Sequence, residues 1–207
     1  MSTTAHITQK CPMCQEEFKA IIQTSSSQFG LYLDFKPNGA IITPEPIPKC
    51  PKCGFVSYEG SFGDEEIEVL SDIFKVYNIF EKEPNMPDYY YFAREMELVY
   101  NSRAYTIADL YIKAVWQSQL YAQYNCCAYK AIKYIDLIDE THSVYSAFKL
   151  IKLDFLRRSG KFVKAKELIS ALQNDACFNK DHADILTLQR KLITRKLTNE
   201  YIMPPFG

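Results

Sequence analysis

Hydrophobic residues recur at helical spacing through most of the chain after residue 63. In the first such stretch Ile67, Leu70 and Phe74 fall on one face, and the acidic residues 64–66 precede them, where negative charge stabilises the start of a helix. The same spacing predicts seven helices with short connections, which suggests antiparallel hairpins in a layered array. Their expected ranges are about 64–83, 88–104, 106–120, 124–140, 144–158, 162–173 and 182–199.

Before residue 63 the pattern alternates and is interrupted by prolines and glycines. Alternation over 18–23 and 31–36 predicts two strands, and the Pro-Asn-Gly sequence at 37–39 indicates a turn. Residues 1–63 hold six of the ten prolines and five of the seven glycines. We therefore predict an α+β, mostly α protein, with a small N-terminal module over 1–63 and a helical domain over 64–207.

Composition and charge are those of an ordinary globular protein. The chain has 207 residues, of which 47% are hydrophobic and 24% charged, and its net charge is −1 at pH 7. No global charge therefore draws it to nucleic acid or membranes. The N-terminal residues lack the apolar core of a signal peptide, and no apolar run approaches the roughly 20 residues of a membrane span. We expect a cytoplasmic protein without membrane association, in which cysteines are thiols or metal ligands.

Two CPxC motifs carry the most specific signal in the sequence. They occupy 11–14 and 50–53, with 35 residues between them. Each pair forms a tight knuckle with two sulfurs directed at one centre, and two knuckles give the tetrahedral S₄ set that Zn²⁺ accepts. Gly54 suits the left-handed position that closes the second knuckle, whereas Gln15 takes the equivalent place in the first. Four cysteines leave no open position, so we expect one structural zinc ion per chain, held by Cys11, Cys14, Cys50 and Cys53.

Other uses of these cysteines stay open. A redox CPxC opens a helix, where its thiol pKa falls, but strand-like sequence follows both pairs here. Iron in a rubredoxin-like site uses similar knuckles, and a disulfide would need an oxidising compartment. Cys177, near His182, is a candidate nucleophile, yet the sequence contains no phosphate loop, HExxH or GxSxG motif. We expect no enzymatic activity, with cysteine-based redox or hydrolytic chemistry as the alternative.

The helical part offers two candidate partner surfaces. Tyr111, Trp116 and Tyr124 are candidates to line a groove for a protein or peptide, although aromatics at helical spacing also pack in cores. Residues 157–197 carry ten basic and four acidic side chains, a net charge of +6. This segment is either a footprint for nucleic acid or an acidic partner, or an ordinary solvated face. Its candidate contact residues are Arg157, Arg158, Lys161 and Lys164.

Two stretches of the chain resemble known families. The sequence LRRSGKFVKAKELI at 156–169 is similar to the middle of a tetratricopeptide repeat, with Gly160, Phe162 and Ala165 at the matching positions. The two knuckles, with Phe18 after the first and Gly54-Phe55 after the second, resemble CPxC-type zinc ribbons and a family of uncharacterised bacterial proteins, domain of unknown function 2225. That resemblance implies a zinc ribbon followed by tetratricopeptide-like helices, and no established activity.

These features together predict a non-enzymatic, zinc-binding protein-interaction protein of the scaffold or adaptor type. The alternative is a nucleic-acid-associated zinc-ribbon factor that uses the basic segment 157–197.

Overall fold

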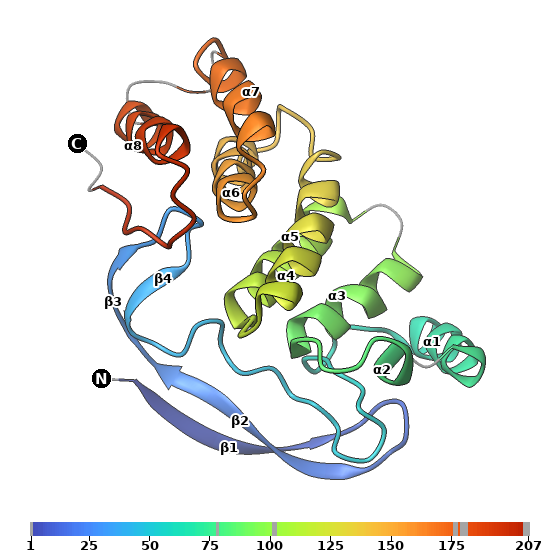
Figure 1. The fold of residues 1–207 in the computed structure, drawn as a ribbon. Helices are drawn as coiled ribbons and strands as arrows, with labels where there is room; N and C mark the ends of the chain where they lie inside the picture. Colours follow the sequence, from blue (N-terminus) through green and yellow to red (C-terminus); the bar gives the residue numbers. More distant parts are fainter. Residues whose placement is uncertain (1, 78, 101–102, 176–177, 179–181, 205–207) are drawn as a thin grey trace. The chain divides into compact units, whose positions relative to one another are not determined.

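The protein is α+β and mostly α, as the sequence predicts. The computed structural model describes all residues except 1, 78, 101–102, 176–177, 179–181 and 205–207, and the described residues form two two-stranded sheets and eight helices (Figure 1). The strands are β1 (Thr3–Lys10), β2 (Glu17–Ser25), β3 (Ser27–Leu31) and β4 (Pro37–Ala40). The helices are α1 (Asp64–Val76), α2 (Ile79–Lys82), α3 (Asp88–Val99), α4 (Ala104–Gln117), α5 (Tyr121–Ile135), α6 (Tyr145–Arg158), α7 (Phe162–Leu172) and α8 (Ala183–Thr194).

The chain divides into two compact units. Unit 1 comprises 1–27 and 40–134, and unit 2 comprises 28–39 and 135–207. These bounds differ from the predicted domains 1–63 and 64–207. One apolar cluster contains Cys11, Cys50 and Phe55 together with Leu70 of α1, so residues 1–63 do not form a separate core.

A long antiparallel hairpin begins unit 1. Strand β1 pairs with β2 so that Lys10 lies opposite Glu17 and Thr8 opposite Lys19. The predicted strand over 18–23 is thereby confirmed as part of β2, whereas β1 was not predicted. Within β1 only Gln9 is buried, so the apolar alternation that marks a strand is weak there.

The helices of unit 1 bury an aromatic core. Helix α3 packs against α4 and also contacts α1 and α2. Its DYYYF sequence places Tyr89, Tyr90, Tyr91 and Phe92 at 4% exposure or less. Most predicted helices are present with shifted ends: for example, α5 covers 121–135 rather than 124–140, and α4 begins at Ala104, two residues before the predicted start at 106.

Residues 31–36 of unit 2, predicted as a strand, form a tight loop instead. The N–H of Tyr32 donates to the carbonyl of Lys36, and Phe35 has φ of 63°. The carboxylate of Asp34, 1% exposed, accepts the N–H of Lys36, which is the local bond by which aspartate closes a turn. The predicted turn at 37–39 is part of β4. That prediction failed because alternation alone does not reveal a buried carboxylate that folds the chain back on itself.

Helices α6 and α7 join as the sequence predicts. Helix α6 ends at Arg158, and Gly160 takes φ of 72°. The N–H of Gly160 bonds to the carbonyl of Arg157, and the N–H of Lys161 bonds to that of Leu156. This pair of bonds is the Schellman motif, in which glycine avoids the steric cost of a left-handed residue. Ala165, in the first turns of α7, is fully buried. No helix among the described residues is long and apolar enough to cross a membrane.

Candidate metal centre

The four cysteines of the CPxC motifs converge in unit 1. The sulfurs of Cys11 and Cys53 are 3.6 Å apart, those of Cys14 and Cys50 are 3.5 Å apart, and all four lie within 4.8 Å of one another. A disulfide needs about 2.05 Å, so these are thiols. Zinc–sulfur bonds of about 2.3 Å would set sulfur–sulfur distances of about 3.8 Å in a tetrahedron. The four side chains therefore fit one metal ion.

Backbone hydrogen bonds repeat in the two knuckles. The N–H of Cys11 donates to the carbonyl of Glu16, and the N–H of Cys50 donates in the same way to Phe55. Four residues after each first cysteine, the N–H of Gln15 or Gly54 donates back to that cysteine's carbonyl. Each motif is thus a closed turn that sets its two sulfurs on one side, which is why a local sequence pattern suffices to predict it.

The residue that closes each knuckle is left-handed. Gly54 has φ of 80° and Gln15 has φ of 62°. The glycine carries this conformation without cost, whereas a residue with a Cβ pays about 1 kcal/mol. The Gln15 side chain donates from Nε2 to the carbonyl of Pro12, a bond that offsets part of that cost. At Gly54 a Cβ would also lie 3.2 Å from Cγ of Phe80.

Burial keeps protons on part of the sulfur set. It raises the pKa of Cys11 to about 11 and the pKa of Cys53 still further above its usual range. Burial also acts on Cys50, but the backbone N–H groups of Cys53 and Lys52 lower the pKa of Cys50 overall. A bound cation would displace these protons, because metal ligands must be thiolates. Metal binding at this site would therefore be coupled to proton release.

A buried glutamate of α3 supports the second knuckle. Glu95 is fully buried, and its Oε1 accepts the N–H of Val56 at 3.3 Å. Val56 forms an isolated antiparallel β-bridge with Lys49, and these two residues flank the second CPxC motif. Burial raises the pKa of Glu95 well above its ordinary value and so favours the protonated carboxyl, while the hydrogen bond from the N–H of Val56 and the charge of Lys49 oppose the shift. No sequence pattern indicates this role, because Glu95 lies 42 positions beyond Cys53 in a helix.

No family model, no curated protein and no solved structure matches this chain. The interpretation of the four thiols as a metal site therefore rests on their geometry.

The predicted aromatic groove residues do not lie together on a surface. Tyr111 is 0% exposed, and its ring stacks on Tyr134 with centroids 6.0 Å apart. Tyr124 is 7% exposed. Neither side chain can reach an external partner in this conformation, because both are buried. Trp116 differs: it is partly buried and lines a cavity.

That cavity, which we name the Trp116 groove, has a volume of about 490 Å³. It is lined by Ile42, Thr43, Pro44, Pro46, Ile47, Asp88, Trp116, Gln117, Ser118 and Gln119. A smaller hollow of about 260 Å³ continues it, since both share Asp88, Gln117 and Gln119. Among the described residues, neither Nε1 of Trp116 nor Oγ1 of Thr43 has a hydrogen-bond partner. A buried indole N–H without an acceptor costs free energy, and a ligand carbonyl would relieve that cost.

The predicted basic surface is also divided by burial. Arg157 is 0% exposed; it donates to Gln189, to the carbonyl of Leu197 and to Asp154. Arg158 is paired with Asp34 at 3.0 Å and with Glu200 at 3.1 Å. These two arginines thus hold unit 2 together, because a buried charge needs partners.

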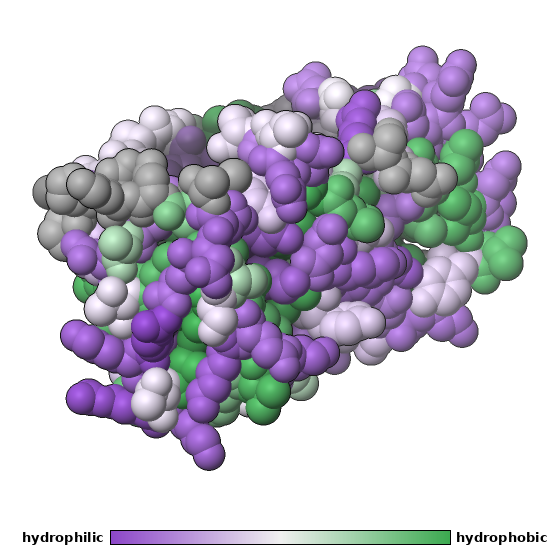
Figure 2. Space-filling model, turned by 90° about the horizontal axis from the view of Figure 1, so that it is seen from above, coloured by the Kyte–Doolittle hydropathy of each residue, from purple (hydrophilic) through white to green (hydrophobic). Residues whose placement is uncertain are grey.

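The other two predicted contact residues, Lys161 and Lys164, are exposed. On the face drawn in Figure 2, hydrophilic side chains are interspersed with hydrophobic areas. Cys177, the candidate nucleophile, lies outside the described residues.

We predict that Gly54→Ala destabilises the protein by about 2 kcal/mol, from left-handed strain and from displacement of Phe80. Gly60→Ala is the matched control, since Gly60 has φ of 73° but open space around its Cβ position; it should cost about 1 kcal/mol. Unfolding by denaturant measures both. Equal losses in the two variants would show that the Phe80 contact has no energetic role.

We also predict a pH effect at Glu95. Its pKa is raised in the folded protein, so the stability linked to its proton is present below about pH 4.5, the unfolded value, and is lost as pH rises toward the folded pKa. Glu95→Gln keeps the neutral form at every pH. Its melting temperature relative to the native protein should therefore rise between pH 5 and pH 8.5. Glu68→Gln, at an exposed position of α1, is the control, and an equal rise there would contradict the assignment.

Proposed function

We propose that this chain is a non-enzymatic protein-interaction module, of the scaffold or adaptor type, stabilised by a structural zinc ion. The observation that carries the proposal is the convergence of four thiols within 4.8 Å. A catalytic zinc keeps one position for water or substrate. Here the protein supplies all four, so the ion would fold the chain rather than react.

The energetic role of the ion follows from where the sulfurs lie. Cys11 and Cys50 are at 1% and 2% exposure, in one cluster with Phe55 and Leu70. Four uncharged thiols contribute little to such a small cluster. A bound zinc ion contributes folding free energy directly, about 10–16 kcal/mol in zinc-finger peptides. We favour zinc over iron because the proposed role is structural and needs no electron transfer.

The Trp116 groove supports the interaction part of the proposal. Tryptophan is favoured at protein interfaces because it combines a large apolar ring with one polar atom. Here that atom, Nε1, has no partner within the described chain, and two prolines and two isoleucines line the same groove. The groove suits a peptide segment that offers a carbonyl oxygen to the indole.

The finer fold assignment and the family remain part of the proposal. The α6–Gly160–α7 connection and the buried Ala165 support a tetratricopeptide-like pairing of these two helices, which suits an adaptor. Membership of the family called domain of unknown function 2225 is proposed on the two knuckles, which are its specific part, and on the tetratricopeptide-like sequence at 156–169. A cytoplasmic location is proposed because a reducing compartment keeps cysteines as thiols or metal ligands.

The alternative, a nucleic-acid-associated factor, keeps only part of its basic surface. Arg157 and Arg158 are committed to partners within unit 2, which leaves exposed lysines such as Lys161 and Lys164. Two results together would favour this alternative. Binding to RNA would weaken steeply with salt, because phosphate contacts release counterions, and the double variant Lys161→Glu, Lys164→Glu would abolish that binding.

For the metal, we predict one zinc ion per chain by elemental mass spectrometry of untagged protein. Of the seven cysteines, the four ligands should resist a thiol reagent until a strong chelator is added. Cys50→Ser should abolish zinc retention and amide protection in β1 and β2, because the ion stabilises the cluster between the knuckles. Cys126→Ser, at an exposed position of α5, should change neither. Full protection of the hairpin in metal-free Cys50→Ser would refute structural zinc.

For the interaction, we predict that a photoreactive amino acid at Gln119, on the rim of the Trp116 groove, forms a discrete covalent adduct with a protein in cells. Trp116→Phe, which removes the indole N–H, should weaken that adduct several-fold, as expected for one lost hydrogen bond. The same amino acid at Lys164, on α7, is the control. Adducts of equal yield from both positions, or adducts made of RNA, would contradict the proposal.

A further inference from the structure

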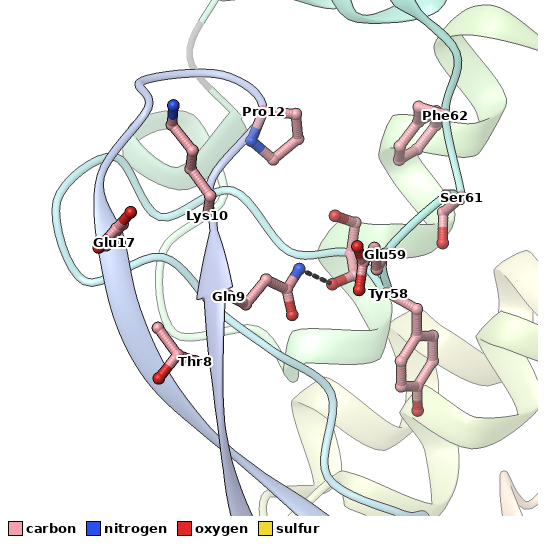
Figure 3. A pocket seen from close by; sticks show the side chains of 11 residues that line it. Thr8, Gln9, Lys10, Pro12, Glu17, Tyr58, Glu59, Ser61 and Phe62 are labelled. Atoms are coloured by element: carbon pink, nitrogen blue, oxygen red, sulfur yellow. Dashed lines mark hydrogen bonds between the residues drawn. The ribbon is translucent and has the colours of Figure 1, made fainter.

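A second cavity in unit 1 lies beside the first knuckle, and we name it the hairpin groove. Its volume is about 350 Å³. One wall is the first hairpin, with Thr8, Gln9, Lys10, Pro12 and Glu17, and the other wall is the segment 57–62. Figure 3 shows Lys10 and Pro12 on one side and Ser61 and Phe62 on the other, with Gln9 reaching across. Nε2 of Gln9 donates to the carbonyl of Ser57 at 3.4 Å.

The pairing register shows which backbone groups of β1 are free. The N–H of Cys11 donates to the carbonyl of Glu16, so this is a hydrogen-bonded pair. Such pairs alternate along antiparallel strands. Thr8 opposite Lys19 and Lys10 opposite Glu17 are therefore the pairs in between. Their N–H and C=O groups point away from the partner strand.

For Thr8 and Lys10 these groups point to the edge of β1 that β2 does not occupy. Within the described part of the chain, neither residue makes a backbone hydrogen bond outside the hairpin. Both residues line the hairpin groove. An open strand edge of this kind is a template for one more strand.

The far wall is held in place by side chains of the helices. The hydroxyl of Tyr58 lies 2.6 Å from that of Tyr89. The ring of Phe62 stacks on Tyr100 at 6.3 Å and meets Phe92 edge-on. The near wall includes Pro12 of the first knuckle, so both walls are positioned before any ligand arrives. A preformed groove lowers the entropy cost of binding.

Three charged side chains line the groove, those of Lys10, Glu17 and Glu59. Lys10 and Glu17 form a cross-strand pair of opposite sign. Glu59, exposed on the far wall, is left without a counter-charge among the groove residues. A ligand with one basic side chain would balance it.

We propose that the hairpin groove binds an extended peptide segment of a partner protein by strand addition to β1, with a lysine or arginine facing Glu59. The free backbone groups of Thr8 and Lys10 supply the main-chain hydrogen bonds, as in other cases of added strands. The groove is bounded on its second side by 57–62, so it admits a single extended chain rather than the sheet edge of a second copy. This inference rests on the proposed function, since it names where a partner segment binds.

The test uses zinc-loaded full-length protein and a displayed library of eight-residue peptides. Alternate positions are valine or threonine, and the others are drawn from lysine, arginine, glutamate and serine. A second library carries a proline at its centre, which removes a main-chain donor. We expect enrichment only from the first library, with basic residues selected. Equal enrichment from both, or none from either, would overturn strand addition.

Two proline variants separate the edges of the hairpin. Thr8→Pro and Lys19→Pro each remove an N–H that points out of the same residue pair, and proline is tolerated at such edge positions. Only Thr8 faces the groove. By fluorescence anisotropy, enriched peptides should bind Thr8→Pro at least about tenfold more weakly, as expected for lost main-chain bonds, and Lys19→Pro within about twofold. Unchanged affinity for Thr8→Pro would refute the site, and so would equal losses in both variants.

A charge-reversed variant keeps the test decisive if Thr8→Pro fails to retain zinc. Glu59→Lys should weaken basic peptides and strengthen versions in which the basic residue is glutamate; no reciprocal change would overturn the proposal. Peptides that bind independently of Thr8 and Glu59, but are lost in Trp116→Phe, would refute this site alone. The proposed function itself fails on other measurements, the zinc content and the Gln119 adduct.

Discussion

Four thiols, two of them buried and two half-buried, lie within 4.8 Å of one another and cannot all ionise without a cation, and this constraint organises the first part of the chain. The sulfurs belong to two turns that are far apart in sequence, so holding them together fixes the start of β2 and the residues after Cys53. The apolar cluster around them recruits Leu70 of α1, and Glu95 of α3 reaches Val56. The helices of unit 1 are thereby tied to the knuckles by both apolar packing and a hydrogen bond. A metal ion at this point would stabilise more than the two turns that bind it.

The features that sequence could predict are those that short patterns determine. The CPxC turns, the glycine that closes the second, and the α6–Gly160–α7 connection each depend on neighbouring residues. The failures depend on distant ones. Asp34 turns the chain back at a position where alternation indicates a strand, and it is stabilised by Arg158, more than a hundred residues later. Arg157 is basic in a basic segment, yet Gln189 and Asp154 keep it in the interior. The presence of a charged residue in the sequence does not show whether its side chain is buried or exposed.

The tyrosines illustrate the same limit. Tyr111 and Trp116 both lie on α4, and nothing in the sequence pattern distinguishes a core position from a surface position for them. In the structure Tyr111 lies in the core, whereas Trp116 lines a groove and its Nε1 has no hydrogen-bond partner among the residues that the structure describes. The hairpin groove was not predicted at all, since its free groups belong to the backbone and no side-chain pattern reports them. The two grooves would bind a partner differently: one through a single indole and its apolar surroundings, the other through main-chain hydrogen bonds and one charged contact at Glu59.

The interleaved bounds of the two units have a consequence for synthesis on the ribosome. Residues 28–39 belong to unit 2 but leave the ribosome before the second knuckle, and their partners in 135–207 leave last. The cysteine cluster can close once Cys53 has emerged, and closing it turns 15–49 into a loop that contains this early segment. Asp34 lies in that loop and lacks its ion-pair partner Arg158 until about a hundred further residues have been translated. A fragment that stops at residue 134 would keep all four cysteines, but Asp34 would lack its ion-pair partner Arg158. No single cut in the chain therefore separates the two units.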